Sequence, residues 1–194
     1  MEALIASFSL VAIAEIGDKT QLLSFVLAAR FPRSSWRIIA GILVATLVNH
    51  LLAAAIGDWV SLHVEPEWMR WILGLAFLGF AIWALIPDSL DENSAQRLRH
   101  GAFLTTVVLF FLAEMGDKTQ FATVALGAHY DSLVLVTFGT TLGMMAANVP
   151  AVLVGESLSR RLPLAKIRFV AAALFAVFGI LVLMGIDFGL TAVS

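Results

Sequence analysis

An eight-residue segment occurs twice in this chain, and both copies lie within strongly apolar sequence. The first copy is Ala14–Gln21, with the sequence AEIGDKTQ, and the second is Ala113–Gln120, with the sequence AEMGDKTQ. The copies are 99 residues apart in a chain of 194 residues and differ only where Met115 replaces Ile16. Ionisable side chains inside a membrane-spanning segment are costly and usually serve a function. The duplication therefore indicates one binding unit that the molecule uses twice.

The composition indicates an integral membrane protein. Hydrophobic residues make up 60% of the chain, charged residues 13%, and the mean hydropathy is +0.95. A soluble domain has roughly 25% charged residues. The sequence has no cysteine, which excludes disulfides and thiolate metal sites. Its net charge is −2 and it has no basic patch, so we expect the lipid bilayer as a partner and no nucleic acid.

Six segments are apolar and long enough to span a bilayer, for which a helix needs about 20 residues. They are Ala3–Ala29, Trp36–Val60, Glu67–Ile86, Gly101–Ala128, Ser132–Leu158 and Ala165–Ile186. The polar stretch 88–100 separates the first three segments from the last three. We therefore expect two three-helix repeats, residues 1–87 and 101–194, within one domain. Because three is an odd number, the second repeat enters the membrane from the opposite side, which predicts an all-α protein with a 3+3 inverted repeat.

The distribution of basic residues predicts the orientation of these helices. The loops expected on one side contain Arg30, Arg33, Arg37, Arg97, Arg99, Arg160, Arg161, Lys166 and Arg168. The other side contains only Arg70. Basic loops of membrane proteins stay in the cytoplasm. We therefore expect the central linker in the cytoplasm and both termini outside.

Each motif places two carboxylates and one lysine on one face of the expected helix, because a helix advances about 100° per residue. The glycine of each motif lies on the opposite face, where the missing side chain allows either close helix packing or local unwinding. If the inverted repeats pack motif against motif, four carboxylates meet near the middle of the membrane: Glu15, Asp18, Glu114 and Asp117. Lys19 and Lys118 reduce their summed charge from −4 to −2, which matches one divalent cation. Calcium and manganese both accept oxygen ligands. The four carboxylates are therefore the expected metal ligands.

Further polar side chains lie in or near the motifs and are expected to support the site. They are Thr20, Thr119, Gln21, Gln120, Asn49 and Asn148. His50 is either a further ligand or a packed core histidine. Crowded carboxylates repel one another and take up protons when no metal is bound. A transporter that exchanges a divalent cation for protons requires a site that can hold either of them.

A purely structural interpretation of the motifs is an ion pair between the glutamate and the lysine of each copy, one helical turn apart. This interpretation leaves Asp18 and Asp117 unexplained. In a membrane, the desolvation penalty of such an ion pair usually exceeds its electrostatic attraction. For the two lysines, however, charge balance alone is a sufficient role. The sequence has no nucleotide-binding loop and no arrangement for covalent catalysis, so we expect neither an enzyme, nor a primary pump, nor a bound cofactor.

Two copies of Glu-x-Gly-Asp-Lys-Thr, in the first and fourth expected spans, resemble the family of the Golgi calcium/manganese transporter (Gdt-one), over nearly the whole chain. The resemblance implies a secondary transporter that exchanges Mn²⁺ or Ca²⁺ for protons, with Glu15, Asp18, Glu114 and Asp117 at the transport site. The chain lacks the long N-terminal extension and large central loop of the eukaryotic members. This favours a manganese exporter of the bacterial inner (plasma) membrane.

Several other functions fit parts of the pattern. A calcium/proton antiporter would use the same oxygen ligands. A passive cation channel with two acidic rings would show a flux that is independent of the proton gradient. An exporter of small organic cations or amino acids would need a roomier and more aromatic site than the residues around the motifs offer. A structural membrane subunit would not need four buried carboxylates.

Overall fold

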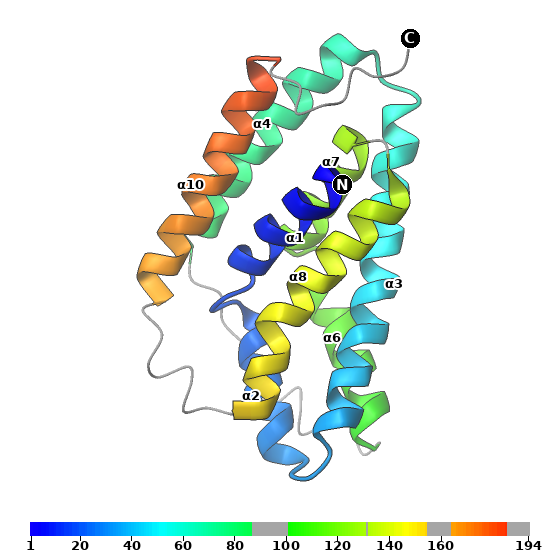
Figure 1. Ribbon diagram of the computed structural model, residues 1–194, viewed down its shortest axis with the longest axis vertical. Coiled ribbons are helices and arrows are strands. Elements are labelled where there is room, and N and C mark those ends of the chain that lie inside the picture. Colours follow the sequence, from blue (N-terminus) through cyan, green and yellow to red (C-terminus); the bar gives the residue numbers. More distant parts are fainter. Residues whose placement is uncertain (87–100, 131, 155–163, 186–194) are drawn as a thin grey trace.

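The computed structural model describes residues 1–86, 101–130, 132–154 and 164–185. In this part of the chain it contains α-helices and no strand (Figure 1). The helices are α1 (Glu2–Ala14), α2 (Lys19–Arg30), α3 (Ser35–Ser61), α4 (Pro66–Ala84), α6 (Ala102–Glu114), α7 (Lys118–Tyr130), α8 (Leu133–Val154) and α10 (Leu164–Leu183). The expected linker 88–100 and the expected basic residues Arg160 and Arg161 lie outside the described residues.

The first and fourth expected spans are interrupted inside the motifs, so the prediction that each motif lies on one face of a helix was wrong. Between α1 and α2, and again between α6 and α7, the chain leaves the helical conformation inside the motif. The cause is a glycine in the left-handed region at each break: Gly17 has φ +84° and Gly116 has φ +75°. A left-handed residue ends a helix, and glycine adopts this conformation without a Cβ penalty. The motif side chains are therefore placed by two helix ends and not by one helix face.

The surface of the protein is apolar and its interior contains charge. Trp36, Trp59 and Trp68 are well exposed, together with many aliphatic side chains along the helices. The buried side chains include carboxylates, a lysine, asparagines and a histidine. In water this distribution would be unfavourable, whereas a surrounding lipid phase accounts for it.

Helix lengths agree with a membrane location. Within the described residues, α3, residues Glu67–Ala84 of α4, and α8 are long and apolar enough to cross a membrane. Glu2–Ala14, Ala102–Glu114 and Arg168–Leu183 form shorter apolar helices. The protein is thus a helical membrane protein.

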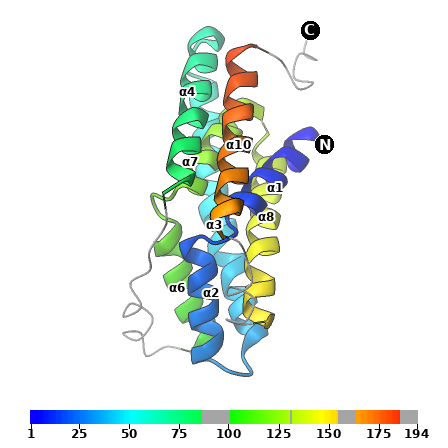
Figure 2. The same cartoon turned by 90° about the vertical axis from the view of Figure 1, so that its left-hand side faces the viewer.

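Glycines and aromatic rings bring the helices together. A Cβ on Gly139 or Gly143 of α8 would lie 2.7 Å from the carbonyl oxygen of Leu4 or Phe8 in α1, so these two helices pack backbone to backbone. The helices α4 and α10 lie side by side in both views (Figure 1 and Figure 2). Their interface includes Phe77 of α4, whose ring centroid is 4.7 Å from that of Phe178.

The two halves of the chain interlock around the helix breaks. Helix α8 packs against α1 and α2, and α3 packs against α6 and α7. The α4–α10 pair contacts α1 and α7 more extensively than it contacts α2 and α6. The breaks lie side by side in the interior, where each is flanked by a long helix from the other half (Figure 2).

Candidate metal site

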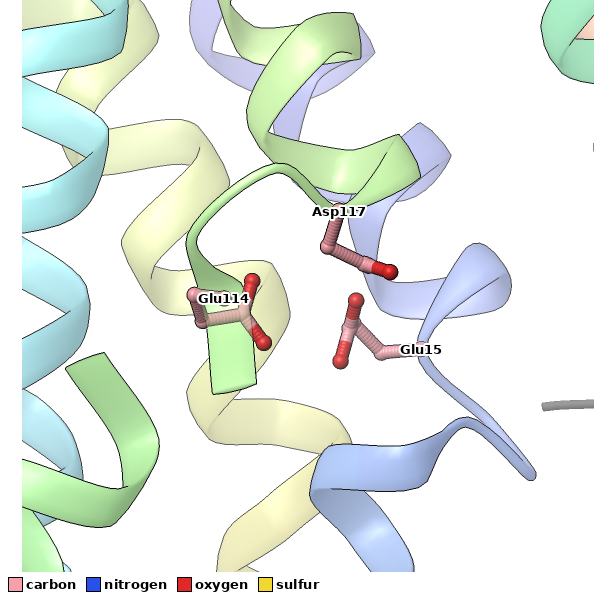
Figure 3. Close-up of side chains that lie close together, drawn as sticks. All are labelled: Glu15, Glu114 and Asp117. Atoms are coloured by element: carbon pink, nitrogen blue, oxygen red, sulfur yellow. The ribbon is translucent and has the colours of Figure 1, made fainter. Parts of the chain in front are cut away.

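Three carboxylates converge where the two helix breaks meet. Glu15 directly follows α1, Glu114 is the last residue of α6, and Asp117 directly precedes α7. Each offers an oxygen, and these oxygens lie within 4.8 Å of one another (Figure 3). Both glutamates are 0% exposed and the aspartate is 1% exposed. The packing of the two breaks therefore brings together residues that are 99 positions apart in the sequence.

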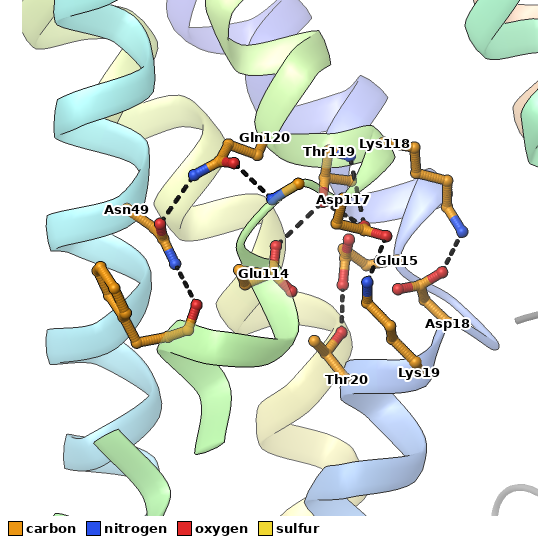
Figure 4. Close-up of polar contacts among 12 residues, drawn as sticks. Glu15, Asp18, Lys19, Thr20, Asn49, Glu114, Asp117, Lys118, Thr119 and Gln120 are labelled. Carbon is orange, nitrogen blue, oxygen red and sulfur yellow. Dashed lines mark hydrogen bonds and ion pairs between the residues drawn. The ribbon is translucent and has the colours of Figure 1, made fainter. Parts of the chain in front are cut away.

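The lysines form ion pairs between the motifs. Lys19 Nζ lies 2.7 Å from Asp117 Oδ1, and Lys118 Nζ pairs with Asp18 Oδ1 (Figure 4). Neither lysine forms, in this structure, the ion pair with the glutamate four residues earlier that the purely structural interpretation supposed. That interpretation required a continuous helix, and the helix breaks redirect the side chains. The two crossed pairs hold one motif against the other.

The fourth expected ligand, Asp18, is buried but stands apart from the group of three. Its Oδ1 accepts the bond from Lys118, which itself is only 4% exposed. A small pocket lies beside this pair. It is lined by Ala84 in the last turn of α4 and by Arg168 in the first turns of α10. Gly17 also lines the pocket. Asp18 is therefore the motif carboxylate that lines this pocket.

A threonine hydroxyl orients each glutamate. Thr20 Oγ1 donates to Glu15 Oε2 at 2.6 Å, and Thr119 Oγ1 lies 3.1 Å from both Glu114 Oε2 and Asp117 Oδ2 (Figure 4). The other oxygen of each glutamate, Oε1, is buried and has no hydrogen-bond partner among the described residues. A buried carboxylate oxygen is stable only with a partner. These two atoms are thus suited to a cation or a proton.

The glutamines hold the helix breaks in place. Gln21 Oε1 accepts the Gly17 N–H at 2.9 Å, and Gln120 Oε1 accepts the Gly116 N–H at 2.8 Å. The Nε2 of Gln21 donates to the carbonyl oxygen of Ala147. Their amide oxygens therefore serve the backbone in this structure and do not point at the carboxylates.

The two repeated asparagines have different partners. Asn49 accepts a bond from Gln120 Nε2 at 2.9 Å and donates to the Phe111 carbonyl at 3.1 Å (Figure 4). Asn148 accepts a bond from Ser24 Oγ at 2.8 Å and donates within its own helix. Ser24 was not among the residues predicted from the sequence, although the hydroxyl residue Thr123 lies 99 positions further on and is a signal of the same repeat.

His50 lies outside the group of three carboxylates. Its side chain is fully buried in α3, and neither ring nitrogen has a hydrogen-bond partner within the described residues. The structure therefore does not bring His50 into the candidate ligand set.

Apolar helices around a buried group of carboxylates are the features of a membrane protein that handles cations. Comparison with known proteins specifies this class. The family model described as divalent cation/proton antiporter GDT1 matches residues 3–92 and 102–187. The chain therefore belongs to the GDT1 family of divalent cation/proton antiporters.

Individual relatives agree with this assignment. The chain is 51% identical to a Vibrio cholerae protein named "Putative manganese exporter", over 90% of this chain and 87% of the relative. It is 27% identical to GDT1-like protein 5 of Arabidopsis thaliana, over 90% of this chain and 92% of the relative. No solved structure gives a significant match.

Proposed function

We propose that this protein exports Mn²⁺ from the bacterial cytoplasm across the inner membrane in exchange for protons. The observation that carries the proposal is the pair Glu15 and Glu114, which are fully buried near Asp117, each with one oxygen lacking a hydrogen-bond partner in the described part of the chain. The name of the Vibrio relative supports manganese as the cargo. The oxygen ligands suit Mn²⁺ and Ca²⁺ equally well, so a calcium/proton antiporter is the alternative.

The charges around the site support an exchange of one divalent ion for two protons. Asp18 and Asp117 are neutralised by Lys118 and Lys19, whereas the two glutamates form no ion pair with any described residue. Ionised, the glutamates together have a charge of −2. One Mn²⁺ or two protons would each neutralise them, and a metal ion binds only to deprotonated carboxylates. The two cargoes therefore compete for the same atoms.

The helix breaks support a six-span arrangement as a 3+3 inverted repeat. In it, α1 with α2 forms the first span and α6 with α7 the fourth, so each motif lies at a break in the middle of a span. Discontinuous helices at the midplane are a recurrent design of transporters with inverted repeats. Residues 1–87 and 101–194 would be the two repeats, with the central linker in the cytoplasm and both termini outside.

The pocket beside Asp18 supports a site that faces the cytoplasm in this structure. Arg168 lies at the pocket in the first turns of α10, and it is one of the basic residues whose distribution predicts a cytoplasmic location. The α4–α10 pair covers α1 and α7, the short helices toward the opposite side. In this orientation Mn²⁺ would enter from the cytoplasm, and a rocking of the repeats would open the site to the outside.

Transport by purified protein in liposomes tests the proposal. With an imposed pH gradient, we expect Mn²⁺ to move against the proton flux, and we expect no Mn²⁺ movement with the Glu15→Gln variant. The same assay with Ca²⁺ decides between the two metals. A Mn²⁺ flux that needs no proton movement in the opposite direction would instead establish a passive channel and overturn the proposal.

A binding measurement tests the competition independently of transport. Mn²⁺ titrations from about pH 5.5 to about pH 8.5 should show an affinity that decreases as the pH falls, because protons occupy the same oxygens. Binding should release protons into a weakly buffered solution. An affinity that is constant over this range would contradict competition for the glutamates.

A further inference from the structure

A hydrogen-bonded chain through α3 of the first repeat joins the two sides of the helix break in the second repeat. Gln120 of α7 accepts the Gly116 N–H and donates to Asn49 of α3. Asn49 then donates to the Phe111 carbonyl at the end of α6. A single asparagine of α3 thus connects α6 with α7 across the break.

At the helix break of the first repeat, the corresponding residues are arranged differently, and the asparagine comes from α8 of the second repeat. Gln21 accepts the Gly17 N–H but donates to the carbonyl of Ala147 in α8, and not to Asn148. Asn148 instead accepts a bond from Ser24 of α2. Among the described residues, Asn148 forms a hydrogen bond to the helix after this break, at Ser24, and none to the helix before it.

The residues in the two arrangements correspond to one another by the 99-residue repeat. Gln21 corresponds to Gln120, Asn148 to Asn49, and Ser24 to Thr123. Thr123 Oγ1 donates at present to the Thr119 carbonyl within its own helix. Corresponding residues of the two repeats thus form different hydrogen bonds. We expect this difference in an inverted-repeat transporter whose two halves are in different conformations.

We propose that the two arrangements are the two positions of one glutamine–asparagine latch, and that the repeats exchange them when the site changes sides. The inference rests on the alternating access that is part of the proposed function. In the opposite state Gln21 donates to Asn148, and Asn148 donates to the carbonyl of Ala12, which corresponds to Phe111. Thr123 then donates to Asn49, as Ser24 now donates to Asn148.

The latch gives each polar side chain a preferred state. Loss of the Asn49 side chain removes two bonds between helices in the present state but only one in the opposite state. For Asn148 the preference is reversed. Loss of the Ser24 hydroxyl weakens the present state, whereas loss of the Thr123 hydroxyl weakens the opposite state. One hydrogen bond of typical net strength changes the ratio of two states about fivefold.

Cysteine labelling measures this ratio directly, because the natural chain contains no cysteine. Arg168 lines the pocket beside Asp18 and is partly exposed. A water-soluble maleimide should modify an Arg168→Cys reporter while the pocket is open, and more slowly in the opposite state. The reporter is measured alone and in combination with single alanine substitutions of the latch residues.

We expect Asn49→Ala and Ser24→Ala to slow labelling of the reporter about fivefold, and Asn148→Ala and Thr123→Ala to accelerate it. Ser24→Ala and Thr123→Ala are the milder pair, because each removes only one hydroxyl. Thr46→Ala is the control: Thr46 is buried one helical turn before Asn49 and its hydroxyl has no partner among the described residues. It should leave the labelling rate unchanged.

The sign pattern separates a latch from a merely structural role. If all four substitutions change the labelling rate in the same direction, or none changes it, the latch is overturned. Mn²⁺ binding to the reporter protein is measured in parallel. Mn²⁺ binding without the sign pattern would overturn the latch alone, whereas the sign pattern without Mn²⁺ binding would support the latch and contradict the proposed cargo.

Discussion

The two acidic residues of each motif have separate partners. Asp18 and Asp117 pair with the lysines of the opposite motif, and the glutamates receive a threonine hydroxyl from their own motif. In the sequence, all four carboxylates lie in the same two motifs. The different partners of the aspartates and the glutamates could therefore not be predicted from it. This division suggests that the glutamates hold the cargo while the aspartate–lysine pairs join the two motifs.

Substitution of one glutamate tests the first of these roles. Glu114→Gln keeps an acceptor for the Thr119 hydroxyl but removes one metal-binding charge. We expect Mn²⁺ affinity to fall by more than about tenfold in calorimetric titrations. The melting temperature of the metal-free protein should change little, because the amide has the size of the carboxylate and keeps the acceptor for the Thr119 hydroxyl. The matched control is Glu67→Gln on the exposed face of α4, and an equal effect of both variants would contradict the assignment.

A double-mutant cycle tests the second role. Asp18→Asn deprives the buried Lys118 of this ionised partner and should lower the free energy of unfolding by about 3 kcal/mol. Lys118→Met in the same chain removes the charge that Asp18→Asn leaves behind, so the double variant should be more stable than Asp18→Asn alone. Unfolding in detergent measures both effects. Additive losses would show that the two side chains do not stabilise each other.

At the scale of the helices, the sequence predicted which segments come together but not how. The repetition of Glu15 at Glu114 correctly indicated that the two motifs meet. The expectation that they lie on helix faces was wrong, because helical periodicity assumes that the helix continues. Gly17 and Gly116 were the signal for a break, but a glycine in apolar sequence equally indicates close helix packing, as at Gly143. The ion pairs between motifs follow from the breaks and were missed with them.

The breaks predict opposite effects for two glycine-to-alanine substitutions. Neither Gly116 nor Gly79 has a neighbouring atom within 4 Å of where a Cβ would lie, so an added methyl group causes no steric clash at either position. Gly116 has φ +75°, so Gly116→Ala should lower the free energy of unfolding of the protein by about 1 kcal/mol. Gly79 lies within α4 and should gain about 0.5–1 kcal/mol. Thermal unfolding of both variants checks this, and a stabilised Gly116→Ala would show that the break is not needed.

At the scale of the whole molecule, composition alone predicted a helical membrane protein, and the apolar surface agrees with it. The six spans remain a prediction. The motif-bearing helices α1 and α6 have 13 residues each and extend only about 20 Å, against a hydrocarbon core of about 30 Å. Joined with α2 and α7 across the breaks they are long enough. The sequence did not settle this division, because the apolar segments continue on both sides of each motif.

The charge balance of the whole site predicts electroneutral transport. If one Mn²⁺ replaces two protons on Glu15 and Glu114, the site has the same charge in both loaded states. The empty, ionised site retains a charge of −2, and moving it through the membrane is expensive, so the return step requires protons. In liposomes whose membrane potential is clamped with potassium and valinomycin, we expect the exchange rate to follow the pH gradient and to be independent of the potential. A rate that changes with the potential at constant pH gradient would mean a different proton number, and with it a further titrating group besides the two glutamates.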